Sequence, residues 1–278
     1  MTAVRRAAAL FTLLALLALP AFRAAAHEAQ DEGLAGVGVD ERLGARVPME
    51  LPLIDLSGKT VRLGDYLRGG PAILTLNYYT CPMLCPLTFR SYAATMDQVK
   101  GLSVSKDYRI VTVSINPEEE PRNARARADE THSFLKGLAD ADDRWLFLRG
   151  SPESIRRLTE SVGFRYKKVG VEYAHATVAI VLTPDGAVSR YLYGIEIPPL
   201  DLKLALIEAA GGKIGASTAA NAILMFCYQY DPAGRKYALV ARNIMKAAGA
   251  ATLLLLAALF LYLRIRPGRR APGREAGE

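Results

Sequence analysis

The sequence predicts an α/β fold with a mixed central sheet, followed by one membrane-spanning helix near the C-terminus. Apolar runs of strand length alternate with segments whose apolar residues recur at helical spacing. Residues 176–194 contain two strand patterns joined by a Pro-Asp-Gly turn, which adds an antiparallel pair to the sheet. Residues 247–263 form an uncharged apolar run that is long enough to cross a bilayer.

The expected elements follow one another in a regular order. Residues 52–70 contain a short strand, a Ser-Gly turn, and a second strand or turn that leads into Gly69-Gly70. Residues 71–79, PAILTLNYY, are a continuous apolar run typical of a buried central strand. Helices are then expected within 87–101, 121–138, 153–163 and 200–212, with strands at 108–115 and 144–150 between them. Ser151 is the expected N-cap of the third helix.

The N-terminal segment has the pattern of a secretory signal peptide. Arg5 and Arg6 precede an apolar run at 7–22, and three alanines at 24–26 form a small-residue cleavage signature. We therefore assign residues 1–26 to a signal peptide; an uncleaved N-terminal anchor is the alternative. Residues 27–47 are rich in Gly, Ala and acidic residues without periodicity, which predicts a flexible lead-in.

The C-terminal part predicts a single-pass membrane anchor. A domain over residues 48–212 is followed by a connector at 213–245, a transmembrane helix at 246–264 and a basic tail at 265–278. The arginines after the span favour a cytoplasmic tail, which leaves the domain on the periplasmic side of a bacterial-type cytoplasmic membrane. Further basic residues precede the span, so this orientation depends mainly on the signal peptide.

The net charge of +7 does not indicate a nucleic-acid binder. Residues 1–26 contribute three of these charges, and residues 264–278 contribute three more. Only +1 is left for the exported part. We expect a membrane but no nucleic acid among the partners.

The most informative motif is NYYTCPMLCPLTF, where Cys81 and Cys85 lie between the buried strand and the next helix. Two thiols four residues apart face the same side of a helical turn, so they can share a metal or a disulfide. A helix N-terminus also favours the thiolate form that both chemistries need. A purely structural disulfide is the alternative, although so short a loop gains little stability from one.

The motif CPMLCP, with the later segment EYAHATVAIVLTPDG, resembles the SCO/SenC family over about residues 48–212. These are copper chaperones with a thioredoxin-like, three-layer fold that act in cytochrome c oxidase assembly. The resemblance implies that Cys81, Cys85 and His175 bind one copper ion, Cu(I) or Cu(II). It also implies delivery to the copper-bearing oxidase subunit, with other copper chaperones or thiol-disulfide reductants as further partners.

His175 precedes the apolar strand TVAIVLT. In thioredoxin-like folds the loop entering that strand passes over the dithiol, which would place an imidazole opposite two sulfurs. Such a mixed donor set suits copper, and zinc could use it with a water as fourth ligand. A hydrogen-bonded packing role is the alternative for this histidine.

Several other residues carry weaker expectations. His132 is expected at the surface, and His27 could chelate Cu(II) only if cleavage makes it the N-terminal residue. Cys227 is expected to be an unpaired apolar cysteine. Many family members have an Asp inside the motif, where this chain has Met83 and Leu84, and an Asp-Pro pair where this chain has Asn116-Pro117. Met83 is expected to pack or to face a partner, although a thioether could also contact Cu(I).

Three functions remain open at this point. The first is a copper metallochaperone that uses Cys81, Cys85 and His175. The second is an enzyme, a thiol-disulfide oxidoreductase in which Cys81 and Cys85 form the redox-active dithiol. The third is a peroxiredoxin-like peroxidase, for which Thr80 is adjacent to Cys81 but no arginine partner can be identified from the sequence.

Overall fold

The computed structural model describes residues 35–67, 69–82, 84–104, 106–135, 145–211, 218–231 and 234–265. Two compact units make up the chain, Met1–Thr218 and Ala219–Glu278. The predicted signal peptide, most of the lead-in and nearly all of the basic tail lie outside the described residues.

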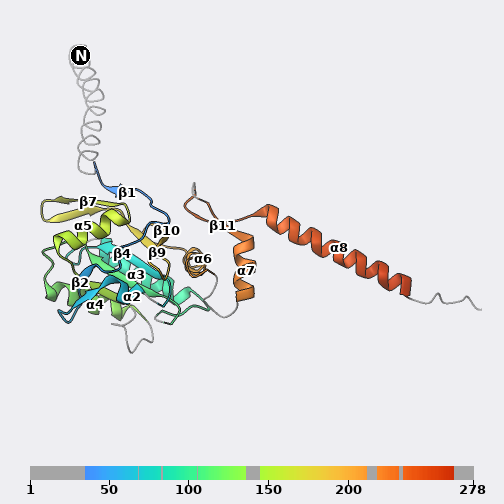
Figure 1. The fold of residues 1–278 in the computed structure, drawn as a ribbon, viewed down its shortest axis with the longest axis horizontal. Helices are drawn as coiled ribbons and strands as arrows, with labels where there is room; N and C mark the ends of the chain where they lie inside the picture. The colour runs from blue at the N-terminus through green and yellow to red at the C-terminus, as the bar shows by residue number, and fades with distance from the viewer. Residues whose placement is uncertain are drawn as a thin grey trace, which may run out of the picture. The chain divides into compact units, whose positions relative to one another are not determined.

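A five-stranded mixed sheet forms the centre of the first unit (Figure 1). Its strand order is β10-β9-β4-β5-β6. Strands β4, β5 and β6 are parallel, β9 is antiparallel to β4, and β10 is antiparallel to β9. The strands are β4 (Ala72–Asn77), β5 (Arg109–Ser114), β6 (Trp145–Leu148), β9 (Val178–Leu182) and β10 (Val188–Tyr193). The predicted mixed sheet, including its C-terminal antiparallel pair, is confirmed.

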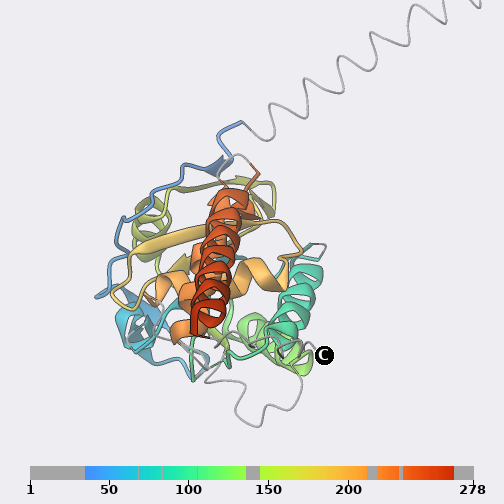
Figure 2. The ribbon, with the colours of Figure 1, turned by 90° about the vertical axis from the view of Figure 1, so that its right-hand side faces the viewer.

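Helices cover both faces of this sheet. On one face, Ile73 of β4 lines a small apolar cavity with Tyr92 of α3 (Leu84–Gln98) and Leu202 of α6 (Pro199–Ala209). Helix α3 also contacts both α4 (Pro121–Ser133) and α6, and α3 and α6 can be followed in Figure 2. Leu74 and Leu76 point to the opposite face because side chains alternate along a strand, and both are buried. The result is a three-layer arrangement.

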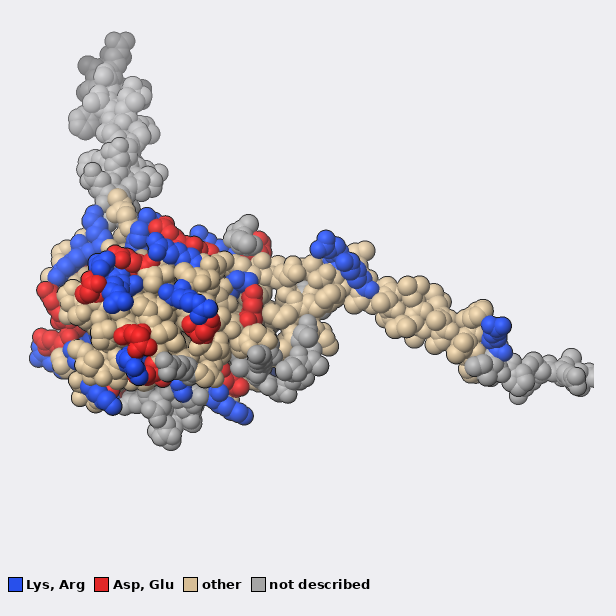
Figure 3. All heavy atoms as spheres, in the orientation of Figure 1, with Lys and Arg blue, Asp and Glu red and all other residues tan. Residues whose placement is uncertain are grey.

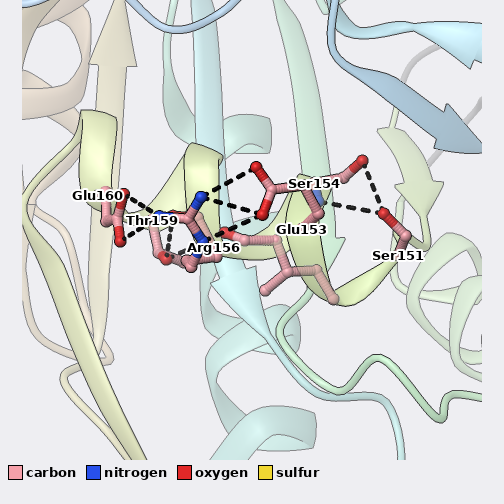
Figure 4. A network of polar contacts seen from close by, with 7 residues as sticks. Ser151, Glu153, Ser154, Arg156, Thr159 and Glu160 are labelled. Carbon is pink, nitrogen blue, oxygen red and sulfur yellow. Dashed lines mark hydrogen bonds and ion pairs between the residues drawn. The ribbon is translucent and has the colours of Figure 1, made fainter.

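Helix α5 (Pro152–Ser161) begins at the predicted N-cap. The Ser151 hydroxyl accepts a hydrogen bond from the Ser154 N–H at 3.1 Å. Arg156 forms ion pairs with Glu153 and Glu160, each at 2.9 Å, along the outer side of the helix (Figure 4). These side chains are more than half exposed, so the pairs contribute little stability.

A second, smaller sheet has the order β1-β7-β8. Its strands are β1 (Gly38–Val39), β7 (Phe164–Val169) and β8 (Glu172–His175). Gly163 has φ +64°, and a Cβ there would lie 1.9 Å from the Asp40 carbonyl oxygen, so glycine permits the close approach of the chain next to β1. The sequence predicts no helix or strand within residues 164–175, and it assigns residues 38–39 to the lead-in, so this smaller sheet was not predicted.

The start of the domain contains the two predicted strands and one helix that was not predicted. Strands β2 (Pro52–Ile54) and β3 (Thr60–Arg62) form an antiparallel pair around the Ser-Gly turn. They lead into the short helix α2 (Leu63–Leu67).

The second unit contains more structure than a simple connector. Helix α7 (Thr218–Cys227) is followed by an antiparallel hairpin of β11 (Tyr228–Asp231) and β12 (Lys236–Leu239). Helix α8 (Ala241–Ile265) follows the hairpin. Its segment Arg242–Arg264, which has 23 residues, is long and apolar enough to cross a membrane. Figure 3 shows its uncharged surface between basic side chains near the two ends.

One prediction concerns a buried hydrogen-bond network between three strands. The Thr112 hydroxyl accepts from Trp145 Nε1 at 2.8 Å and lies 2.7 Å from the Thr75 hydroxyl. Thr112→Val should lower the free energy of unfolding by about 1–3 kcal/mol, because it leaves buried polar groups without a partner. Denaturant unfolding of the full chain in detergent, followed by the fluorescence of its single tryptophan, measures this. Thr60→Val on exposed β3 is the control, and an equal effect there would contradict the prediction.

Candidate metal centre

The two motif cysteines lie together where β4 leads into α3. Cys85 belongs to the first turn of α3, and Cys81 precedes that helix. Their exposed fractions are 7% for Cys81 and 3% for Cys85, and neither forms a disulfide. The two side chains are within hydrogen-bonding reach of each other. The structure therefore presents a buried, reduced dithiol.

The backbone that leads into the dithiol is held by side chains from the β5–α4 region. The Tyr79 N–H donates to Glu119 at 2.8 Å, and Glu119 is itself buried. Arg127 of α4 donates to the Tyr79 carbonyl through Nε at 3.1 Å and through Nη2 at 2.9 Å. The same Nη2 donates to the Cys81 carbonyl at 3.0 Å. Sequence reasoning identified neither residue as part of the site.

The spacing of buried residues along α4 indicates that Arg127 lies on the buried face of this helix. The buried residues of this helix are Ala124, Ala128 and Thr131. Position 127 is three residues after the first of these and four before the last, which places it on the same helix face. An arginine on the buried face of a helix needs a specific polar partner, and the motif carbonyls supply it.

His175 lies near the dithiol but on a different sheet. It is the last residue of β8, not a loop residue, and it pairs with Tyr166 of β7. Its ring packs edge-on against Tyr78, with 5.9 Å between ring centroids. Tyr78 donates a hydrogen bond to Glu172, and its hydroxyl is within hydrogen-bonding reach of Cys81. Tyr78 thus contacts both a predicted cysteine ligand and the predicted histidine ligand.

Burial controls the protonation of these groups. It raises the pKa of the Cys85 thiol, and the neighbouring Cys81 raises it further, whereas the positive charge of Arg127 acts in the opposite direction. The expectation that the helix N-terminus favours the thiolate is therefore outweighed at Cys85. Burial lowers the pKa of His175, although a contact with the Ala176 carbonyl opposes this shift. A lowered pKa favours the neutral imidazole, which is the form that binds metals.

The structure does not bring the three predicted ligands into one cluster. Within the described residues, no three His, Cys, Asp or Glu side chains are grouped closely enough to hold a metal ion. Cys81 and Cys85 are together, while His175 lies on β8 and packs on Tyr78, which is within hydrogen-bonding reach of Cys81. The donor types still suit a soft metal, because two sulfurs and an imidazole are available on adjoining elements.

Comparison with known proteins identifies the family. The sequence model described as SCO1/SenC matches residues 39–202, which is more than half of the chain. The chain belongs to the SCO1/SenC family. A search of curated proteins gave no match.

Solved structures share the fold of this SCO1/SenC chain. A protein from Aquifex aeolicus VF5, named for a suggested role in electron transfer, is 26% identical, with a TM-score of 0.55 over 61% of this chain and 95% of that one. BsSco, a Sco-family cytochrome c oxidase assembly protein, is 22% identical, with a TM-score of 0.50 over 62% and 96%. Copper-bound ScoI from Arabidopsis thaliana is 24% identical, with a TM-score of 0.48 over 60% and 98%. The thioredoxin-like fold expected from the motif is confirmed.

The other candidate residues of this SCO1/SenC chain have different outcomes. His132, expected at the surface, is partly buried: its Nε2 lies 2.9 Å from the Trp145 carbonyl oxygen and its ring packs on Phe147. Asn116 accepts a hydrogen bond from Tyr173 at 3.1 Å. His27 and Met83 lie outside the described residues, as does the side chain of Cys227.

Thiol reactivity tests the electrostatics of the site. In a Cys81→Ser, Cys227→Ser chain, Cys85 is the remaining thiol, and burial still raises its pKa. Its alkylation rate should keep rising above about pH 10, where an ordinary thiol with a pKa of about 8.5 has levelled off. Mass spectrometry after timed iodoacetamide treatment measures the profile, with the same chain in guanidinium chloride as control. A plateau below pH 9 in the folded chain would contradict the prediction.

Proposed function

We propose that this chain is a copper-binding metallochaperone whose ligands are Cys81, Cys85 and His175. The observation that carries the proposal is the buried, reduced dithiol at the start of α3. Soft sulfur donors select Cu(I), and an added imidazole accommodates Cu(II). The residues carried over from the family resemblance are the same three. Tyr78 contacts both Cys81 and His175, which links the dithiol to the proposed imidazole ligand.

The proposed role is delivery of copper to the copper-bearing subunit of a cytochrome c oxidase during assembly. SCO1/SenC membership supports this, and BsSco is named among the assembly proteins of that oxidase. Copper would pass to the subunit by exchange of ligands, without a chemical transformation of the cargo. Other copper chaperones are the proposed source of the ion.

The proposed location is the cytoplasmic membrane, with the thioredoxin-like domain in the periplasm. The signal peptide at 1–26, the span at 246–264 and the basic tail support this arrangement.

Copper binding tests the proposal directly. The full chain, purified reduced and anaerobically in detergent, should bind one copper ion and, with Cu(II), show a thiolate-to-copper charge-transfer band that Cys81→Ser abolishes. His175→Ala should weaken binding at least about tenfold, because losing an outer-shell partner alone costs about 10- to 100-fold. The controls are Cys227→Ser and His132→Gln, which should bind like the parent. Unchanged affinity in His175→Ala would refute the three-ligand site.

The alternative function is a thiol-disulfide oxidoreductase, favoured by the proximity of the two thiols. One cysteine would attack a disulfide in a partner, and the other would displace the partner's thiol to leave a disulfide in this chain. A disulfide switch described for BsSco fits this chemistry. His175→Ala separates the functions, because disulfide formation between Cys81 and Cys85 does not need the imidazole. A chain that binds no copper but forms this disulfide readily would favour the alternative.

Reporter fusions test the proposed orientation. Alkaline phosphatase, which needs disulfides that form outside the cytoplasm, should be active when fused after Gly211 and inactive when fused after Glu278. A cytoplasmic reporter, β-galactosidase, should show the reverse pattern at both positions. Phosphatase activity at both sites would contradict a membrane-spanning α8.

The hydrogen bonds of Arg127 do not support a peroxidase function. The Nε and Nη2 groups of Arg127 donate to the carbonyls of Tyr79 and Cys81, and Nη1 donates to Glu130. The guanidinium therefore holds the backbone of the motif, whereas a peroxidase would need its donors directed at a bound peroxide.

A further inference from the structure

The feature that the proposed function leaves unexplained is a nearly buried arginine beside the dithiol. The Arg127 side chain is 11% exposed, and its three donations to the Tyr79 and Cys81 carbonyls fix its position against the motif. Its remaining Nη1 group forms an ion pair with Glu130 at 2.6 Å, and Glu130 is 46% exposed. Arg127 is thus buried against the motif, whereas its partner Glu130 is about half exposed to water.

The fixed positive charge of Arg127 stabilises the two oxidation states of the proposed copper ion to different extents. Copper held by two thiolates and a neutral imidazole carries a net charge of −1 as Cu(I) and 0 as Cu(II). Reduction adds one electron from an external donor and no proton, so the charge change stays within the site. A neighbouring cation stabilises the more negative state, and more strongly where water is excluded.

We propose that Arg127 is a positioning and charge-compensating residue that favours Cu(I) over Cu(II) at the dithiol, and that Glu130 limits this effect by pairing with it. The inference rests on the proposed copper site and adds to it the oxidation state that the site prefers. Arg127 and Glu130 are one helical turn apart on α4, so the protein can set this preference with residues that do not touch the metal.

The other charges near the motif do not replace Arg127. Glu119 accepts from Tyr79 and Glu172 accepts from Tyr78, and both are acidic. Arg149 donates to the Glu119 carbonyl at 3.2 Å and not to a carbonyl of the motif. Arg127 instead donates to the Cys81 carbonyl at 3.0 Å, so its guanidinium lies directly against the motif. Its charge therefore acts on the dithiol itself.

The test uses the full chain in detergent, loaded with one copper ion, and measures the midpoint potential of the Cu(II)/Cu(I) couple with small redox mediators. Arg127→Gln should lower the Cu(I):Cu(II) preference about tenfold, which is a fall of ~59 mV for a one-electron couple. Arg127→Lys keeps the charge and should restore most of the potential. Glu130→Gln leaves Arg127 uncompensated and should shift the potential upward.

The control is Arg125→Gln, which removes a 43% exposed arginine of the same helix that pairs with Asp129 at 3.9 Å. It should leave the potential unchanged. If Arg127→Gln fails to fold, as thermal unfolding would show, Glu130→Gln decides alone, since its side chain is half exposed. Unchanged potentials in Arg127→Gln and Glu130→Gln, or shifts of both in one direction, would overturn the charge pair while copper binding stands. No copper binding by the parent chain would overturn both this inference and the proposed function.

Discussion

Strand β4 is the constraint on which the site depends. All six of its residues are buried, and the strand pairs with β5 on one side and β9 on the other. The ladder continues to its end, where the Ile115 N–H donates to the Asn77 carbonyl at 2.8 Å. A one-residue slip would turn every side chain of the strand to the opposite face, so the register is strongly fixed. The chain therefore enters the cysteine motif at a defined position and direction.

The two tyrosines after β4 extend this control into the motif. The Tyr79 hydroxyl donates to the Leu148 carbonyl at 2.6 Å, which ties the motif to β6. Glu119 accepts a hydrogen bond from the Tyr79 N–H, and Arg127 donates to the Tyr79 carbonyl, so the backbone of Tyr79 is held on both sides. The dithiol is thus built on a backbone that is held by hydrogen bonds at the Tyr79 N–H and at the Tyr79 and Cys81 carbonyls, so little rearrangement is required for the two sulfurs to act together. Such preorganisation lowers the entropy lost on binding.

Burial of the dithiol has opposing effects on its chemistry. Exclusion of water disfavours the Cys85 thiolate, so the helix N-terminus alone does not activate it. A metal ion that displaces the thiol proton supplies the positive charge that the buried sulfur lacks, and binding then releases protons. Arg127 supplies a second positive charge from the protein.

The sequence correctly predicted the elements that depend on residues close together along the chain. The buried strand at 71–79, the Ser151 cap and the Pro-Asp-Gly hairpin each depend on neighbouring residues, and each is confirmed. The cysteine motif could be placed because it directly follows β4. The contacts of Tyr78, Glu119 and Arg127 with the motif were missed, because they join polar side chains that are distant in sequence. Hairpin β7–β8 was missed because the polar residues on β7 weaken its apolar alternation.

The placement of His175 on the smaller sheet bears on how the proposed copper site is completed. The cysteines are fixed by the central sheet, whereas His175 belongs to β8, which pairs with β7 at the edge of the smaller sheet in the described part of the chain. Tyr78 contacts Glu172, Tyr173 and His175 of that strand. Tyr78 therefore joins the central sheet to the strand that carries the imidazole, since it lies within hydrogen-bonding reach of Cys81 and packs on His175. In the proposed site, Cys81 and Cys85 would supply the sulfur ligands from the central sheet and His175 would supply the nitrogen ligand from β8.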